Sequence, residues 1–225
     1  MHPHRLTYTL RALAFLLRYP DHEVRARAPE ALQVMAEEGA VPPGRLRRLQ
    51  ALVANWQRQD GYDVEAAYVE TFDRGRSTSL HLFEHVHGDS RERGPAMIDL
   101  LRTYEAAGLH LRSHELPDYL PVLLEFASTQ PPDIARGLVG EVAHIVNAVV
   151  GALLRRRSAY ADVLMAVLEA CGQTVEPVEP DDEPGLDASW AEPEAFGGCP
   201  VAAATGSERP VHLVRRRPDA TASVV

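Results

Sequence analysis

Apolar residues recur every three or four positions along most of the first 173 residues, the spacing that places them on one face of an α-helix. The first stripe spans residues 6–17, and Arg18-Tyr-Pro20-Asp21 then ends that helix and caps the next. Similar stripes predict helices near residues 22–38, 44–58, 63–73, 79–87, 95–107, 119–128, 134–155 and 159–171. No segment alternates with period two. The pattern therefore predicts an all-α fold, a single-domain bundle of about eight to nine helices with no sheet.

Glycine and proline mark the expected ends of these helices. Gly39, Gly108 and Gly172 stand where C-terminal caps belong, and Pro42-Pro43 and Pro131-Pro132 mark loops. In the middle of the chain, Gly88 can end a short helix in the left-handed conformation, and Gly94-Pro95 can open the following helix. Residues 88–94 are therefore predicted to form a turn. Asp118 is predicted to be the N-cap of the next helix, with Pro121 at its third position.

Composition divides the chain at about residue 173. Residues 174–225 hold seven of the 17 prolines and carry ten acids against four arginines. We therefore expect residues 1–173 to form the helical domain and residues 174–225 a largely disordered acidic C-terminal tail. Within this tail, residues 189–197 contain Trp190 and Phe196, which favours a segment that docks on the helical body or on a partner.

Charge and targeting signals limit the class of partner. Residues 1–173 have a net charge of −3, so no basic field covers the helical domain and nucleic acid is not expected as a partner. The N-terminal apolar stripe lacks a cleavage site, and the run from Ile145 to Leu154 is shorter than the ~20 residues of a membrane span. Two cysteines without a pairing framework suit a reducing compartment. A cytoplasmic protein without membrane insertion is the expectation.

Residues 68–97 concentrate histidines, acids and arginines. Within them, His81-Leu-Phe-Glu84-His85 fits H-x-x-E-H, in which two histidines on one helical face bind zinc and the glutamate activates water. A zinc-dependent hydrolase is one alternative, although the pattern fixes only three letters and such sites need a further acidic ligand. A general helical adaptor acting through its acidic tail is another. We expect no metal site, because the pattern specifies no further acidic ligand, and no enzyme activity, because no Gly-rich phosphate loop or nucleophile motif accompanies it.

Read together, the motifs resemble the NarJ-type nitrate reductase molybdenum cofactor assembly chaperones, which are related to the TorD-type redox enzyme maturation chaperones. A softer likeness covers residues 16–21 and 190–196, so the resemblance spans nearly the whole chain. At His81 that family usually has an aromatic residue, which weakens the zinc interpretation. The motifs that carry the resemblance are Tyr68-Val-Glu-Thr-Phe72-Asp73, Ser79-Leu80, Glu84-His85-Val86-His87-Gly88, Ser90-Arg91, Arg93-Gly94, Ala96-Met97, Glu115-Leu-Pro-Asp118-Tyr119-Leu-Pro121 and Leu124-Glu125.

The resemblance implies a chaperone that binds the N-terminal segment of the apo catalytic (alpha) subunit of respiratory nitrate reductase. It would keep that subunit competent for insertion of bis-molybdopterin guanine dinucleotide and an iron–sulfur cluster before membrane docking, and would not belong to the mature enzyme. It would bind no cofactor stably. Further implied partners are the alpha–beta complex and cofactor-biosynthesis proteins.

Client segments of this kind are amphipathic and basic, and they dock through apolar anchors with charges at the rim. We expect aromatic residues to line the groove, carboxylates to meet the basic client, and Arg91 and Arg93 to orient them. His85 and His87 would make binding weaker at pH 6 than at pH 8, because a protonated imidazole places positive charge beside a basic peptide. The predicted client-binding residues are Tyr68, Phe72, Glu84, His85, His87, Asp89, Arg91, Arg93, Glu115, Asp118, Tyr119 and Glu125.

Overall fold

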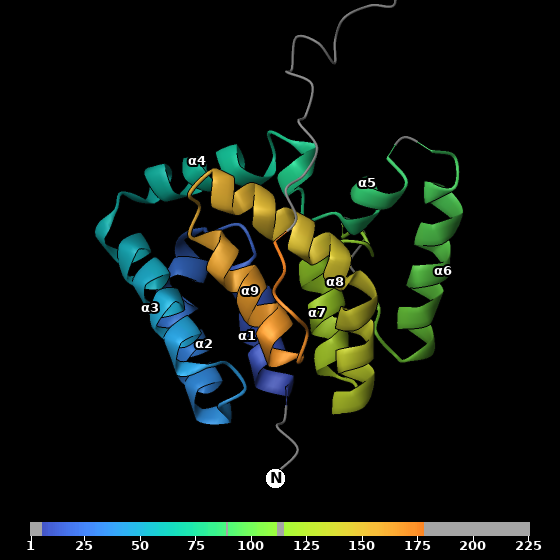
Figure 1. Cartoon of the computed structure of the whole chain (residues 1–225), viewed down its shortest axis with the longest axis horizontal. Helices are drawn as coiled ribbons and strands as arrows, with labels where there is room; N and C mark the ends of the chain where they lie inside the picture. Colours follow the sequence, from blue (N-terminus) through green and yellow to red (C-terminus); the bar gives the residue numbers. More distant parts are fainter. Residues whose placement is uncertain (1–5, 89, 112–114, 178–225) are drawn as a thin grey trace, which may run out of the picture. The chain divides into compact units, whose positions relative to one another are not determined.

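Helices account for almost all regular structure in the residues that the computed structural model describes, which are 6–88, 90–111 and 115–177 (Figure 1). In this part of the chain the one β-type pairing is an isolated bridge between His81 and Tyr119. The all-α prediction is therefore confirmed. The elements are α1 (Thr7–Leu16), α2 (His22–Glu38), α3 (Pro43–Arg58), α4 (Gly61–Phe72), the 3-10 helix η1 (Arg76–Thr78), α5 (Leu82–Val86), α6 (Arg93–Ala106), α7 (Leu120–Ser128), α8 (Pro132–Arg155) and α9 (Tyr160–Ala170).

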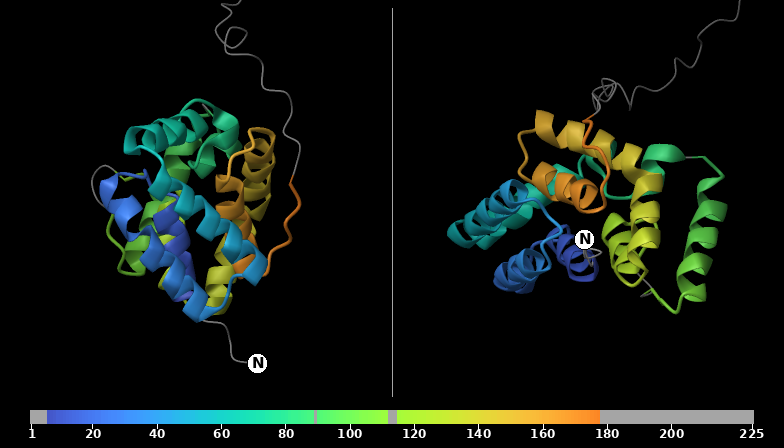
Figure 2. Two further views of the ribbon diagram at one scale, coloured as in Figure 1. Left: turned by 90° about the vertical axis from the view of Figure 1, so that its left-hand side faces the viewer. Right: turned by 60° about the horizontal axis from the view of Figure 1, so that its bottom comes forward.

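Helix α1 forms the centre of the core. The leucines of the first predicted stripe, Leu10, Leu13, Leu16 and Leu17, are fully buried. They are surrounded because α1 packs against α2, α7 and α9, as Figures 1 and 2 show from different sides. Burial of each leucine contributes about 1.5–3 kcal/mol, so this helix anchors the fold.

Two further contacts close the bundle around α1. Helix α3 lies between α2 and α9, and Arg45 on α3 binds both Asp162 and Glu169 on α9, the latter at 2.7 Å. Helix α8 packs against α7 and α9. Helix α8 has 24 residues and extends well beyond the short apolar run at residues 145–154. Within the described ranges, it is the one helix that is long and apolar enough to cross a membrane. Half of its most apolar stretch is buried, as in a core helix of a bundle.

The predicted helix ends agree closely with the structure. Gly39, Gly108 and Gly172 have φ values of 71°, 82° and 71°, the left-handed conformation expected of C-terminal caps. Helices α3 and α8 begin at Pro43 and Pro132, one or two residues earlier than predicted. Proline fits there because the first helical position has no intrahelical partner for an N–H group.

The segment before α5 departs from the prediction. A helix was expected over residues 79–87, but α5 begins only at Leu82, after η1. Residues 79–81 are held away from helical geometry by pairing with the chain before α7. The backbone N–H of Leu120 donates to the Leu80 carbonyl at 2.9 Å, and the N–H of Leu82 donates to the Asp118 carbonyl at 3.0 Å. A partner almost forty residues away along the sequence therefore decides the local conformation.

Helix α6 lies at the outer edge of the helical domain (Figures 1 and 2). Its one fully buried side chain is Tyr104, whose ring centroid lies 4.7 Å from that of Phe126 and whose hydroxyl donates to the Pro117 carbonyl at 2.9 Å. Gly88, with φ of 51°, ends α5 as predicted, and a turn leads to α6. Asp89, residues 112–114 and residues 178–225 of the predicted tail (174–225), including the 189–197 segment and Cys199, lie outside the described residues.

Candidate functional site

The aromatic face of α4 begins the site. Tyr68 and Phe72, one helical turn apart, are each about 95% buried, and their ring centroids lie 4.8 Å apart. The Tyr68 hydroxyl donates to the carbonyl of Leu17 at 2.8 Å and lies 3.3 Å from the Tyr119 hydroxyl. Burial raises the pKa of Tyr68 far above its ordinary value, so the hydroxyl remains a neutral donor. These contacts join α4 to the end of α1 and the start of α7.

Helix α5 and the start of α6 form a wall beside this aromatic face, and the carboxylate of Asp118 connects the two. The side chain is completely buried, and Oδ2 accepts from the backbone N–H of Phe83 at 3.2 Å. Oδ1 lies 3.4 Å from Nδ1 of His81, and Oδ2 lies 3.8 Å from Nη2 of Arg93. Arg93 also lies 3.5 Å from Oε1 of Glu84. One buried carboxylate therefore connects the N-terminus of α5 with the first residue of α6.

This geometry corrects the predicted role of Asp118. The N-cap of α7 is Tyr119, no side chain caps that helix, and Pro121 falls at its second position. Asp118 instead caps α5, because its carboxylate accepts from an N–H that has no partner within the first turn of that helix. Arg93 pairs with the carboxylate of Glu84 within the chain.

Three adjoining hollows form a groove along these residues. The central hollow, of about 450 Å³, contains the aromatic face and shares Phe72, Asp73, Ser79 and His81 with a hollow of about 380 Å³ beside α5. It shares Glu115 and Tyr119 with a third hollow of about 400 Å³ beside α7. We call the three together the groove. Its lining consists of Arg18, Tyr19, Glu23, Tyr68, Phe72, Asp73, Gly75, Arg76, Ser79, Leu80, His81, Glu84, Arg93, Leu109, His110, Leu111, Glu115, Leu116, Tyr119, Pro121, Val122 and Glu125.

The groove has an aromatic and aliphatic middle and charged edges. Within the described part of the chain, its lining holds five carboxylates and three guanidinium groups, a net charge of −2. Such a surface suits an amphipathic segment that places apolar side chains on the floor and basic side chains at the rim.

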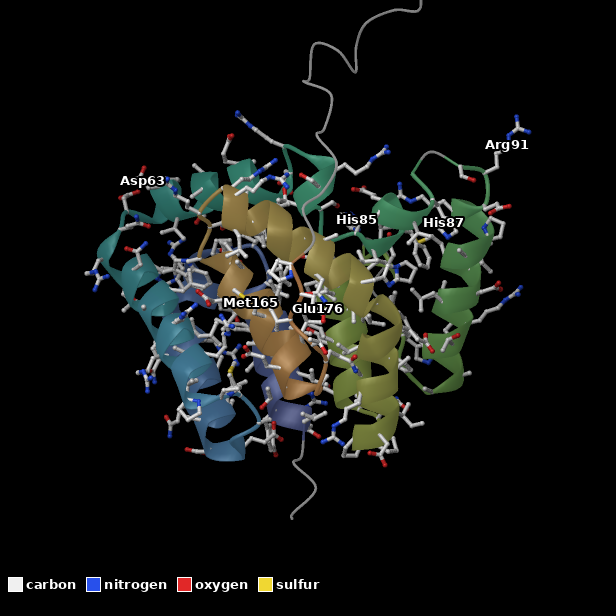
Figure 3. All side chains as sticks on the ribbon, viewed as in Figure 1. Asp63, His85, His87, Arg91, Met165 and Glu176 are labelled. Atoms are coloured by element: carbon white, nitrogen blue, oxygen red, sulfur yellow. The ribbon has the colours of Figure 1, made fainter. Side chains whose placement is uncertain are left out.

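The predicted site residues fall into several places. Arg91 points outward from the turn before α6 (Figure 3), and Asp89 lies outside the described residues. His85 turns inward, with Nε2 2.9 Å from the carbonyl of Ser79, and the ring of His87 packs against Phe83 with centroids 5.4 Å apart. Asp118 lies behind the wall. The seven that line the groove are Tyr68, Phe72, Glu84, Arg93, Glu115, Tyr119 and Glu125.

The H-x-x-E-H pattern does not form one helical face. His81 is the N-cap of α5, with an extended backbone, so it does not share a turn of helix with His85. Its ring contacts Asp118, whereas the ring of His85 contacts the Ser79 carbonyl. Among the described residues, no three His, Cys, Asp or Glu side chains are placed together as metal ligands.

Tyr19 lines the groove but is not one of the predicted client-binding residues. Its side chain is 44% exposed and its ring meets that of Tyr68 edge to face at 5.6 Å. The hydroxyl donates to Oε2 of Glu65 at 2.9 Å, and Oε1 of Glu65 binds Arg25 at 2.7 Å. The bond to Arg25 lowers the pKa of Glu65. The signal in the sequence is Tyr19-Pro20 after the first helix, but nothing local indicates that this turn meets α4.

Comparison with known proteins identifies the family. A model described as nitrate reductase delta subunit matches residues 42–166. The chain is 38% identical over 208 residues to the nitrate reductase molybdenum cofactor assembly chaperone NarJ of Escherichia coli (strain K12), covering 86% of this chain and 88% of the relative. It is 35% identical over 153 residues to the nitrate reductase-like protein NarX of Mycobacterium tuberculosis (strain ATCC 25618 / H37Rv), covering 68% of this chain but 22% of that longer protein.

A solved structure shares the fold. The crystal structure described as a redox enzyme maturation protein from Archaeoglobus fulgidus superimposes with a TM-score of 0.53 at 17% identity, covering 72% of this chain and 91% of that one. The expectation from the sequence motifs is thus confirmed by independent matches over most of the chain. The chain belongs to the nitrate reductase delta subunit family, a family of molybdenum cofactor assembly chaperones rather than catalytic enzymes.

Proposed function

We propose that this protein is the dedicated chaperone of a respiratory nitrate reductase and that its groove binds the N-terminal segment of the apo catalytic subunit. The observation that carries the proposal is the groove itself, an aromatic floor with an acidic edge beside α7. A short amphipathic, basic segment would bury its apolar face on Tyr119 and Phe72 and place its cations beside the carboxylates.

Family membership supports the choice of client. The E. coli and M. tuberculosis relatives are both named for nitrate reductase. In the mycobacterial relative, the matching segment belongs to a longer nitrate reductase-like chain. We therefore take the catalytic subunit as the partner, with the alpha–beta complex and cofactor-biosynthesis proteins as further partners.

The bound client would be held open while bis-molybdopterin guanine dinucleotide and the iron–sulfur cluster are inserted, before it docks at the membrane. The molybdenum cofactor is cargo for the client in this scheme, and the chaperone holds no cofactor of its own and acts in the cytoplasm. Release requires weaker binding to the mature client. A difference of about 2–3 kcal/mol changes occupancy about 30- to 150-fold, so a modest loss of contacts on maturation is enough.

The test is calorimetric titration of the full chain with a synthetic peptide that copies about the first fifteen residues of the catalytic subunit from the same organism. Leu116→Ser and Ile134→Ser form a matched pair, because the two side chains are 46% and 54% exposed and only Leu116 lines the groove. We expect Leu116→Ser to weaken binding about ten-fold, or about 1.4 kcal/mol, and Ile134→Ser to leave it within about two-fold.

Absence of saturable binding, or equal losses in the two variants, would remove the proposal. A helical adaptor that acts through its tail would give a different result. Deletion of residues 178–225 would then abolish binding while Leu116→Ser had no effect.

Tyr19 gives a second test of the groove. Tyr19→Ala removes part of the lining of the central hollow. We expect it to weaken peptide binding about five- to thirty-fold, the range of an aromatic contact worth about 1–2 kcal/mol. Tyr19→Phe keeps the ring and loses only the hydroxyl bond to Glu65, so its effect should stay within about three-fold. Tyr62→Ala is the control, because Tyr62 is 84% exposed and does not line the groove. Equal affinities for Tyr19→Ala and Tyr62→Ala would exclude Tyr19 as a contact.

A further inference from the structure

The two ends of the groove differ in charge. Beside α7, the described residues of the lining contribute the carboxylates of Glu23, Glu115 and Glu125 and one guanidinium group, that of Arg18, a net charge of −2. We call this the acidic end. His110 and Tyr119 are the other titratable residues in this part of the described lining.

Beside α5, the lining is balanced. Two carboxylates, Asp73 and Glu84, face two guanidinium groups, Arg76 and Arg93. We call this the balanced end. The buried carboxylate of Asp118 lies behind Arg93, where the Phe83 N–H, the His81 ring and Arg93 itself contact it. The balanced end therefore offers two guanidinium groups as cationic hydrogen-bond donors, whereas the described residues place one, that of Arg18, at the acidic end.

A helical segment with a free N-terminus is itself polarised. Its α-ammonium group is positive at neutral pH, and the unpaired N–H groups of its first turn add partial positive charge. The last carbonyl groups carry partial negative charge and are satisfied by donors such as arginine. The two poles of the segment complement the two ends of the groove.

We infer that the groove binds its client segment in one direction, with the client's N-terminus over Glu115 and Glu125 and its C-terminal end beside Arg76 and Arg93. This inference rests on the proposed function. In this direction the remainder of the client leaves the groove beside α5. The direction is set by electrostatic attraction at partly exposed edges, so added salt should reduce the preference while apolar burial continues to hold the segment.

The test places a nitroxide label on a cysteine side chain at residue 2 or residue 14 of the peptide, with the α-amine left free, and reads line broadening of backbone amides in the full-length chain. We expect the residue-2 label to broaden the amides of Val122 and Glu125 more than those of Gly75 and Glu84. The residue-14 label should give the opposite pattern. The reverse assignment, or equal broadening of both ends by both labels, would overturn the inference while leaving the proposed function intact. No saturable binding would overturn both.

Acetylation of the peptide's α-amine gives a second measurement that does not depend on labels. Removal of this charge should weaken binding to the unmodified chain about three- to ten-fold. The loss should shrink to less than about two-fold in Glu125→Gln and persist in Arg76→Gln, because only the first substitution removes a partner of the N-terminus. A loss that disappears in Arg76→Gln and persists in Glu125→Gln would place the N-terminus at the balanced end and contradict the inference.

Discussion

Asp118→Ala is expected to lower the free energy of unfolding by about 2–4 kcal/mol, because it removes a buried cap and leaves the Phe83 N–H without an acceptor. The carboxylate is completely buried and also faces His81 and Arg93. Its loss should therefore loosen α5 and the start of α6, which form the wall of the balanced end. Chemical denaturation measures the global cost, and amide hydrogen exchange over residues 82–86 measures the local one.

Asp118→Asn is the matched control. Its amide oxygen can still accept from the Phe83 N–H, but it carries no charge to attract Arg93. We expect a cost of about 1 kcal/mol and little change in exchange over α5. If the alanine and asparagine variants lose the same stability, the charge rather than the cap holds this wall. An alanine variant as stable as the unsubstituted chain would contradict both roles.

The sequence predicts the helices of this protein well because their causes are local. The leucine stripe of α1 requires only a spacing of three and four residues, and it is buried as expected. The caps at Gly39, Gly108 and Gly172 depend on a backbone conformation that glycine adopts without strain. The starts at Pro43 and Pro132 likewise follow from the chemistry of one residue.

The errors occur where a distant segment decides the conformation. Residues 79–81 have a sequence compatible with a helix, but they pair with the chain around Tyr119. Asp118 stands before a helix, as an N-cap does, yet its carboxylate reaches the N-terminus of another helix. Local preference cannot rank these alternatives, because both satisfy the same chemistry and only the tertiary packing distinguishes them.

The candidate site shows the same division. Sequence motifs selected Tyr68, Phe72 and Tyr119, which the fold brings together in the groove. The predicted client-binding residues do not include Tyr19, which joins the groove from a turn after α1. His85 and His87 were predicted to contact the client because imidazole can carry charge, but in the structure their rings contact Ser79 and Phe83. The residue types in the sequence therefore indicate which side chains a site could use. Which of them line the groove depends on the helices and turns that the fold brings together.

Tyr68→Ala is expected to have the largest effect on stability, about 3–5 kcal/mol, because it leaves a cavity at the point where α1, α4 and α7 meet. The side chain is 5% exposed, and its ring contacts those of Tyr19, Phe72 and Tyr160 at centroid distances of 4.8–5.7 Å. Such aromatic pairs contribute about 0.5–1.5 kcal/mol beyond the burial of their area. The groove floor should collapse with the ring, so peptide binding should be lost together with stability.

Tyr68→Phe separates the ring from the hydroxyl. It removes the 2.8 Å bond to the Leu17 carbonyl, but the Tyr119 hydroxyl, 3.5 Å from the same oxygen, remains close enough to replace it. We therefore expect a cost of about 0.5–1.5 kcal/mol and peptide affinity within about three-fold of the unsubstituted chain. Urea denaturation and the peptide titration, carried out on both variants, check these values. If both variants lost the same stability, the hydroxyl bond to the end of α1 would be the main support of the groove floor, because the phenylalanine ring fills the same space and keeps the same aromatic contacts.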